Sequence, residues 1–236
     1  MKNRYIHLIN MNKIIQIAAI AVLLCIVSCG NKQAQSDKMH SKAKDVQSQT
    51  VKDLKDAIYG EATAHAKYAA FARQASLENL PRIAALFQAT SQAESIHLQN
   101  HEKALQAIGE EYYKPVVKSF EVKTTAKNLQ AAIEGEKYEF TTMYPKFFVD
   151  AQRDYEDGAA KSFKWAFRAE QRHAQLYRAA LANIRHPEKQ AKVYFVCPTC
   201  GNVDANRPTE ICEICGTSGR KFIRFAASPA QPNTNK

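Results

Sequence analysis

The sequence predicts a mainly α-helical protein, in which a four-helix bundle precedes a small C-terminal module with short β-strands. Three observations support this fold class. Between residues 51 and 187, apolar side chains recur at spacings of three and four, the period of one helix face. Within this region the pattern Glu-x-x-His occurs twice. Two Cys-x-x-Cys pairs follow, where the helical periodicity stops.

The length and composition suit a globular protein. The chain has 236 residues, enough for one large domain and one small one, and 45% of them are hydrophobic. The formal net charge is +10, but the Lys and Arg residues are scattered along the chain. Because no basic block is interleaved with aromatic residues, the sequence argues against nucleic-acid binding.

The N-terminus predicts export. Lys13 precedes an apolar run over residues 14–27, which is short for a membrane-spanning helix. The run ends in Ile-Val-Ser-Cys at Cys29 and resembles the lipobox of bacterial lipoproteins, in which that cysteine is lipidated. We therefore expect a signal peptide over 1–29 and a membrane-anchored lipoprotein of the cell envelope, on a periplasmic or outer-membrane face. An uncleaved anchor helix is one alternative. A misidentified start on a cytoplasmic protein is another, and Met11 is a second candidate start.

Two segments lack the apolar content needed to fold alone. Residues 30–50 are rich in Gln, Ser, Lys and Asp and predict a flexible tether. Residues 227–236 contain Pro229 and Pro232 and predict a disordered tail.

Residues 51–187 predict four long helices, each with an apolar face interrupted by acids at mid-length. A glutamate on a buried helix face is costly unless it is paired or bound to metal. The linker 109–124 is expected to cross over between two helical hairpins, and Pro145 is expected to kink the third helix. The four apolar faces run over residues 54–75, 83–108, 129–147 and 163–184.

The acids and histidines of the bundle predict a two-metal site. Glutamate and histidine three residues apart project from one helix face. Two such pairs, with single glutamates from two other helices, make up a di-iron or di-manganese carboxylate site. A salt-bridge network at the helix ends is the alternative. The candidate ligands are Glu61, Glu94, His97, Glu136, Glu139, Glu170 and His173.

The spacing of these residues also indicates an internal duplication. Glu61 and Glu136 are 75 residues apart, whereas Glu94 and Glu170 are 76 residues apart. Tyr68 lies seven residues after Glu61, on the same helix face, and Tyr144 lies five residues after Glu139. Both tyrosines are expected to donate hydrogen bonds to ligand carboxylates.

The C-terminal cysteines predict a second metal site between strands expected at 192–196 and 221–225. Two closely spaced pairs on short turns, each followed by glycine, favour four thiolates on one metal over a disulfide framework. Tetrahedral thiolate suits zinc or a single iron, and the adjoining two-metal site favours iron because a redox site needs an electron entry. The four ligands are Cys197, Cys200, Cys212 and Cys215.

These motifs, in this order, resemble the rubrerythrin family over residues 51–226. The resemblance implies a ferritin-like bundle over 51–187 and a rubredoxin-like domain over 192–226. It also implies that Glu94 and Glu170 bridge two irons and that Glu61 and Glu136 are terminal ligands. His173 would stay on one iron, while His97 and Glu139 would alternate on the other. The extra Glu139 distinguishes the family from ordinary ferritin-like oxidases, and the residue at the matching position of the first helix is Ala64.

The resemblance implies a peroxidase that reduces hydrogen peroxide to water in oxidative-stress protection. Electrons would pass from an external donor through the four-cysteine iron to the di-iron site, in a homodimer whose rubredoxin-like domain serves the partner's bundle. The first alternative is a ferroxidase or iron-handling protein that uses the same site. The second is a non-enzymatic, zinc-containing interaction module on a lipid anchor.

Four further residues are given secondary roles. His65 and His101 lie near the apolar helix faces without an evident partner. They are expected either to hydrogen-bond residues that hold the metal or to lie on the surface, rather than to be ligands. Trp165 is expected to serve packing. Asn202 stands where the rubrerythrin family usually has an aromatic residue, which weakens the evidence for packing over the four-cysteine metal.

Overall fold

The computed structural model describes residues 48–111, 115–117 and 119–227, which belong to one compact unit. The expected signal peptide with Cys29, the tether up to residue 47 and the tail from residue 228 lie outside the described residues. Within the described ranges, no helix is both long and apolar enough to cross a membrane.

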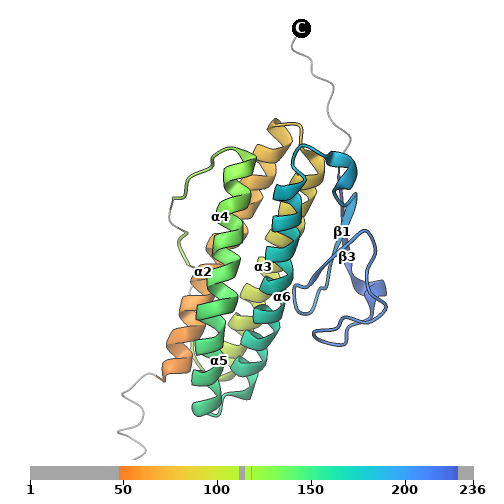
Figure 1. The fold of residues 1–236 in the computed structure, drawn as a ribbon. Helices are drawn as coiled ribbons and strands as arrows, with labels where there is room; N and C mark the ends of the chain where they lie inside the picture. Colours follow the sequence, from red (N-terminus) through yellow and green to blue (C-terminus); the bar gives the residue numbers. More distant parts are fainter. Residues whose placement is uncertain (1–47, 112–114, 118, 228–236) are drawn as a thin grey trace, which may run out of the picture. The chain divides into compact units, whose positions relative to one another are not determined.

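Helices α2, Gln49–Leu77, and α3, Pro81–Ala107, form the first hairpin of the bundle. Helix α2 begins two residues before the expected boundary at 51, because Ser48 caps it by accepting a hydrogen bond from Val51 N at 3.2 Å. Helix α6, Asp157–Ala182, is the last of the bundle. Figure 1 shows these helices running side by side with the remaining one.

That remaining helix is interrupted by a π-helix. Helix α4, Thr125–Tyr138, continues through the π-helix Glu139–Met143 into helix α5, Tyr144–Arg153. This irregularity, which the sequence did not predict, lies just before Pro145, the residue at which a kink is expected. A π-turn adds one residue to a helix. The added residue accounts for the change from a 75-residue repeat before it to a 76-residue repeat after it.

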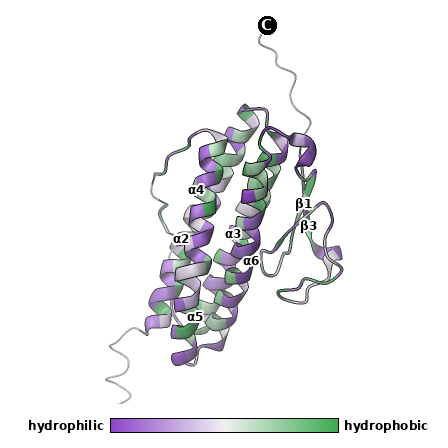
Figure 2. Ribbon diagram, in the orientation of Figure 1, coloured by the Kyte–Doolittle hydropathy of each residue, from purple (hydrophilic) through white to green (hydrophobic). Residues whose placement is uncertain are grey.

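The bundle core contains two hydrophobic clusters, each with packed aromatic rings. One contains Tyr68, Phe87 and Tyr177, and the other contains Tyr144 and Phe163. Apolar residues line the inner faces of the helices while polar residues cover their outer faces (Figure 2). Buried glutamates lie where the two clusters meet, since Tyr68 of one cluster and Tyr144 of the other each donate a hydrogen bond to a buried glutamate.

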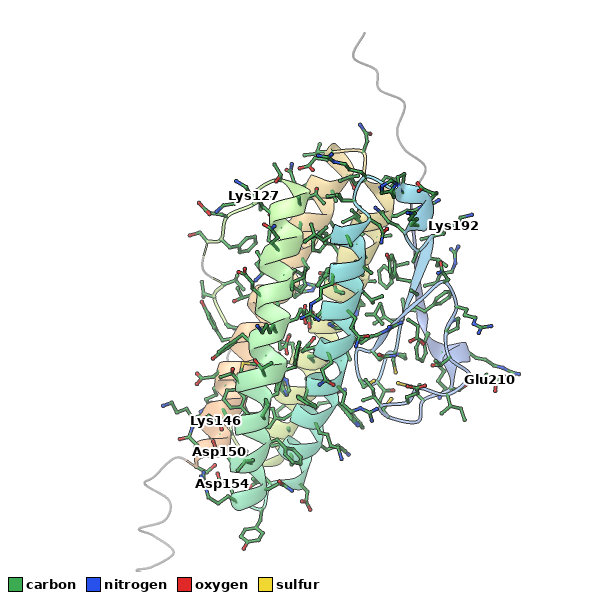
Figure 3. All side chains as sticks on the ribbon, viewed as in Figure 1. Lys127, Lys146, Asp150, Asp154, Lys192 and Glu210 are labelled. Atoms are coloured by element: carbon green, nitrogen blue, oxygen red, sulfur yellow. The ribbon has the colours of Figure 1, made fainter. Side chains whose placement is uncertain are left out.

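Polar contacts at one end of the bundle join α2 to α5. Asp154 accepts hydrogen bonds from the backbone and the hydroxyl of Thr50, at 3.0 and 2.8 Å. Lys146 pairs with Asp150 at 2.7 Å one helical turn away, near Asp154 (Figure 3). These contacts fix the start of α2 beside the end of α5.

The C-terminal module is a three-stranded antiparallel sheet in the order β2-β1-β3. Strands β1, Val193–Val196, and β3, Ile223–Ala226, lie close to the expected positions. Strand β2, Val203–Ala205, was not expected, because three residues with Asp204 at the centre show too little alternation to indicate a strand. The module packs on its own bundle, where Asn100 Nδ2 donates to Thr199 O at 2.8 Å.

Candidate metal centres

The bundle brings six of the seven predicted ligands into two overlapping groups. Ligand atoms within each group lie within 4.8 Å of one another. Glu94 and Glu170 belong to both groups, which is compatible with the bridging role that the family resemblance implies for them. The first group adds Glu61 and His97, and the second adds Glu136 and His173.

The two imidazoles face this cluster through Nδ1. Nδ1 of His97 lies 2.8 Å from Glu170 Oε1 and 2.9 Å from Glu94 Oε2. Nδ1 of His173 lies 2.7 Å from Glu170 Oε2 and 3.5 Å from Glu94 Oε1. The rings themselves are stacked, with centroids 5.8 Å apart. The two histidines are thus related across the pair of shared glutamates, as the internal duplication requires.

The donor set fits two divalent cations. The ion pairs that the structure describes for Glu61, Glu94, Glu136 and Glu170 involve only histidines, so no Lys or Arg neutralises these buried acids. Atoms without a hydrogen-bond partner in the described chain include both carboxylate oxygens of Glu170 and Nδ1 of His173. Buried charges in this arrangement call for metal, and oxygen-rich sets with imidazole suit iron or manganese. A salt-bridge network does not account for them.

The titration behaviour of these residues reflects their crowding. Burial, followed by the charge of Glu94, holds the pKa of Glu170 well above its usual range. Burial alone would lower the pKa of His97 and of His173, but the charge of Glu170 raises both well above the usual value. Without metal, the cluster therefore retains protons, and metal binding must displace them.

The two predicted tyrosines hydrogen-bond the terminal glutamates crosswise. Tyr68 shares α2 with Glu61, yet its hydroxyl donates to Glu136 Oε1 at 2.7 Å. Tyr144 follows Glu136 along the chain, yet its hydroxyl donates to Glu61 Oε1. Each half of the duplication thus orients the terminal ligand of the other half.

Glu139 is the one predicted ligand that lies outside both groups. It opens the π-helix and is partly buried. Burial, together with the charges of Glu61 and Glu136, raises its pKa well above the usual range. The structure therefore has His97 in the cluster and Glu139 outside it, which is one of the two arrangements that the family resemblance implies for this pair.

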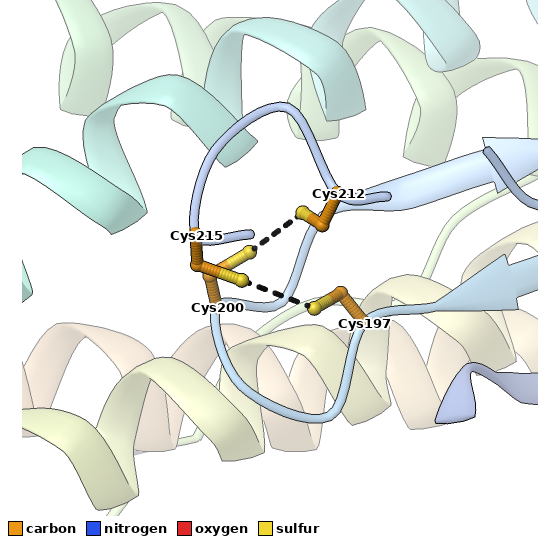
Figure 4. Close-up of side chains that lie close together, drawn as sticks. All are labelled: Cys197, Cys200, Cys212 and Cys215. Carbon is orange, nitrogen blue, oxygen red and sulfur yellow. Dashed lines mark hydrogen bonds between the residues drawn. The ribbon is translucent and has the colours of Figure 1, made fainter. Parts of the chain in front are cut away.

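The four C-terminal cysteines converge on one point. Their Sγ atoms lie within 4.8 Å of one another, and the pairs Cys197–Cys215 and Cys200–Cys212 are each 3.5 Å apart (Figure 4). These separations exceed a disulfide bond, so the cysteines are free. Metal–sulfur bonds of about 2.3 Å give tetrahedral S–S edges of about 3.8 Å, which the cluster fits. Hydrogen bonds from Cys200 and Cys212 lower the pKa of Cys197 to about 4, so this group accommodates a thiolate.

The two centres are joined through the ligand histidines. His97 Nε2 donates to the carbonyl of Cys200 at 3.0 Å, and His173 Nε2 donates to the carbonyl of Gly201 at 3.1 Å. Because a carbonyl only accepts, Nε2 of each ring carries the hydrogen and Nδ1 keeps its lone pair for a metal. Gly201, at φ +76°, permits this approach, since a Cβ there would overlap the His97 ring.

Three of the residues with predicted secondary roles lie outside both metal centres: Trp165 packs, and Asn202 and His65 form hydrogen bonds. Trp165 of α6 packs on the apolar cluster around the cysteines, so a bundle residue supplies an aromatic there. Asn202 Nδ2 instead donates to Asp204 Oδ1 at 3.1 Å. His65 is exposed and contacts Ser91 O at 2.7 Å.

His101, by contrast, is fully buried and has two hydrogen-bond partners that its sequence context did not indicate. Nδ1 lies 2.7 Å from Ser162 Oγ, and Nε2 lies 3.0 Å from Tyr144 Oη. Both partners come from later helices, so the pattern within α3 carried no signal for them. Burial lowers the pKa of His101.

Comparison with known proteins agrees with this geometry. The rubrerythrin family model matches residues 52–181. The chain is 36% identical to nigerythrin of Nitratidesulfovibrio vulgaris over 184 residues, covering 78% of this chain and 90% of that protein. It is 34% identical to rubrerythrin-2 of Clostridium acetobutylicum over 177 residues, covering 73% of this chain and 94% of that protein.

The fold comparison points the same way. The solved structure of fully reduced, all-ferrous nigerythrin superimposes with a TM-score of 0.71, at 36% identity, over 76% of this chain and 88% of that one. Nigerythrin has also been solved in a mixed-valence state. The chain therefore belongs to the rubrerythrin family of oxidoreductases, with a di-iron site of glutamates and histidines in a helical bundle and a four-cysteine site beside it.

Proposed function

We propose that this protein reduces hydrogen peroxide to water at the di-iron centre, with electrons supplied by the four-cysteine site of the same chain. The observation that carries the proposal is the pair of hydrogen bonds from His97 and His173 to the carbonyls of Cys200 and Gly201. Each imidazole joins the carboxylate cluster to the backbone of a cysteine turn. Electrons would therefore cross between the centres through the backbone of the cysteine turn, one hydrogen bond and one imidazole.

The reaction consumes one peroxide, two electrons and two protons, and it forms two waters. When bound, two irons would supply both electrons, which would allow the O–O bond to break without release of a radical. The chain's own residues hold that centre in place. Glu94 and Glu170, which belong to both ligand groups, would hold both metals, while Tyr68 and Tyr144 each hydrogen-bond one terminal carboxylate. All four described cysteines are assigned to the second metal, which argues against a thiol peroxidase.

The electron route proposed here differs from the expectation that a partner subunit's module serves each bundle. In its support, the cysteine module contacts its own bundle at several points around the histidines. Arg168 Nη1 donates to Glu213 O at 3.1 Å, and Asn100 Nδ2 donates to Thr199 O at 2.8 Å. Together with the Cys200–His97 hydrogen bond, these contacts hold the cysteine module against the bundle of the same chain, which supports a route within one chain.

The oxidant is tested by mixing the fully reduced, iron-loaded protein anaerobically with either peroxide or oxygen in a stopped-flow instrument. Peroxide is expected to oxidise the bundle at least tenfold faster than oxygen at equal concentration. Faster oxidation by oxygen, with added Fe(II) consumed and ferric iron retained, would support the ferroxidase alternative. A protein that binds only zinc after expression in iron-rich medium would support the non-enzymatic alternative.

A further inference from the structure

We infer that Ser162 and His101 form, with Tyr144, a hydrogen-bond chain of fixed direction that positions the carboxylate of Glu61 and makes its iron easier to reduce. The inference concerns positioning residues behind one terminal ligand. It rests on the two-iron centre and not on the choice of oxidant, so it stands or falls separately from the proposed peroxidase activity.

His101 occupies a place where an apolar residue would be expected. Its ring is fully buried in the cluster formed by α2, α3, α5 and α6, with the Phe163 centroid at 5.3 Å and the Tyr144 centroid at 5.7 Å. An imidazole in such surroundings is costly unless both nitrogens are satisfied. Both are satisfied here, by Ser162 Oγ at 2.7 Å and Tyr144 Oη at 3.0 Å.

The direction of the chain follows from its last member. The carboxylate of Glu61 only accepts, so the single hydroxyl proton of Tyr144 is donated to it. The Tyr144 oxygen must then accept from Nε2–H of His101. A neutral imidazole that donates through Nε2 accepts through Nδ1, so the Ser162 hydroxyl donates to Nδ1. Every donor in the chain therefore points toward Glu61, and such aligned bonds polarise one another.

The other half of the duplication lacks this chain. The residue 76 positions after His101 is Tyr177, just as Tyr144 lies 76 positions after Tyr68. The Tyr177 hydroxyl meets Thr90, whose own hydroxyl contacts Leu86 O at 3.1 Å. Among the hydrogen bonds of the described residues, that path ends on the backbone of α3 and reaches no candidate ligand. Tyr68 donates to Glu136, and Tyr177 contacts Tyr68 through its ring, with centroids 5.5 Å apart, whereas the Tyr177 hydroxyl meets Thr90. The two irons thus have unequally supported terminal ligands.

The inequality has a chemical consequence. A stronger hydrogen bond to Glu61 withdraws charge from the carboxylate and weakens its donation to metal, which favours the ferrous state. The effect opposes that of Glu139, whose carboxylate would favour the ferric state on the same iron. The Ser162–His101–Tyr144 hydrogen bonds therefore favour the ferrous state of the iron that Glu61 would bind, which is the state expected when His97 is its ligand.

The tautomer gives the first test. Protein labelled with ¹⁵N-histidine and loaded with diamagnetic zinc is examined by long-range ¹H–¹⁵N NMR. We expect His101 to be protonated at Nε2 with Nδ1 as acceptor, and Ser162→Ala to increase the Nδ1–H form. A His101 ring protonated at Nδ1 in the wild type would overturn the assigned direction.

The reduction potential gives the second test. In iron-loaded protein, His101→Leu is expected to disfavour reduction of one iron about tenfold, which is ~59 mV for one electron. His101→Gln, which keeps one donor and one acceptor, should restore most of the shift. Tyr177→Phe is the matched control, because it removes a buried hydroxyl at the duplicated position and should leave the potential unchanged.

A double-mutant cycle shows whether His101 acts through Tyr144. In a Tyr144→Phe background, His101→Leu should produce no further change in potential. Additive shifts would mean that His101 acts through packing alone. A shift below twofold for His101→Leu in the otherwise wild-type protein would also overturn the inference, whatever the peroxide activity.

Discussion

The backbone carbonyl of Cys200 accepts a hydrogen bond from Nε2 of His97 at 3.0 Å. One residue thus belongs to the four-cysteine site, and the other faces the carboxylate cluster through its opposite nitrogen. His97 is therefore both a ligand candidate and a hydrogen-bonded link between the two centres. It also explains why the cysteine turn carries glycine at position 201, where any side chain would meet that ring.

Gly201→Ala should separate the two centres, and Gly216→Ala provides the control. Both glycines have positive φ, at +76° and +78°, so alanine should cost each turn roughly 1 kcal/mol. Only at Gly201 would the new Cβ overlap His97, since nothing lies within 4 Å of a Cβ at Gly216. Donor-driven peroxide turnover should fall at least tenfold in Gly201→Ala alone. Equal turnover in the two variants would mean that electrons take another route.

Mixed dimers show which bundle each cysteine module serves. Chains carrying Cys200→Ser keep the bundle residues, and chains carrying His173→Ala keep all four cysteines. If each module serves its own bundle, dimers assembled from the two variants should show no donor-driven turnover. Restoration to about half the wild-type rate would show that electrons cross between subunits.

Glu139→Ala should distinguish the two oxidants. Glu139 lies outside the cluster and has Ala64 as its counterpart in the duplicated half, so only one of the two halves offers a possible ligand at this position. Without its carboxylate, peroxide reduction is expected to slow about tenfold, while oxidation by oxygen is retained or increased. Stopped-flow rates for both oxidants give the comparison. An equal loss of both reactions would indicate a structural ligand only.

Removal of a shared glutamate should abolish metal-dependent stability. Glu170→Ala eliminates the carboxylate that belongs to both ligand groups, so the rise in Tm on adding Fe(II) should disappear. The metal-free protein should unfold near its wild-type temperature, because burial and neighbouring acids already raise the pKa of Glu170. Glu134→Ala, at an exposed position on α4, is the control and should keep the metal response. A preserved iron-dependent rise in Glu170→Ala would contradict the assignment.

The lipid anchor remains a proposal with a direct test. Wild-type protein should fractionate with membranes and carry lipid on Cys29, as shown by mass spectrometry of the mature N-terminus. A tether of about 20 residues reaches roughly 25 Å and would hold the bundle beside the bilayer. Cys29→Ala should release the protein or leave its precursor uncleaved. Recovery of the wild type among soluble proteins with residues 1–29 intact would refute export.

The sequence predicted the features that depend on spacing along single helices. Glutamate and histidine three residues apart must share a helix face, so Glu94 with His97 and Glu170 with His173 could be paired before the fold was known. The two cysteine pairs were equally informative, because both turns place thiolates close together. The change from a 75-residue to a 76-residue repeat is the trace in the sequence of the residue that the π-turn adds, although an irregularity was expected only at Pro145.

Features that depend on contacts between distant segments could not be predicted in this way. His101 meets Ser162 and Tyr144 only because three helices converge, and no pattern within α3 indicates this. The approach of Gly201 to His97 is set by packing of the cysteine module on the bundle. Strand β2 is stabilised by pairing with β1 and by hydrogen bonds from Thr209 to Asp204, not by its own alternation.

The most direct test of the account is a single turnover of the fully reduced protein with one equivalent of peroxide, followed at wavelengths that separate the two iron centres. The bundle irons should oxidise first. The four-cysteine iron should oxidise second, as an electron passes from it through the Cys200–His97 contact, at a rate independent of protein concentration. Oxidation of the four-cysteine iron before the bundle, or at a rate that rises with protein concentration, would contradict peroxide reduction at the bundle by electrons from the same chain.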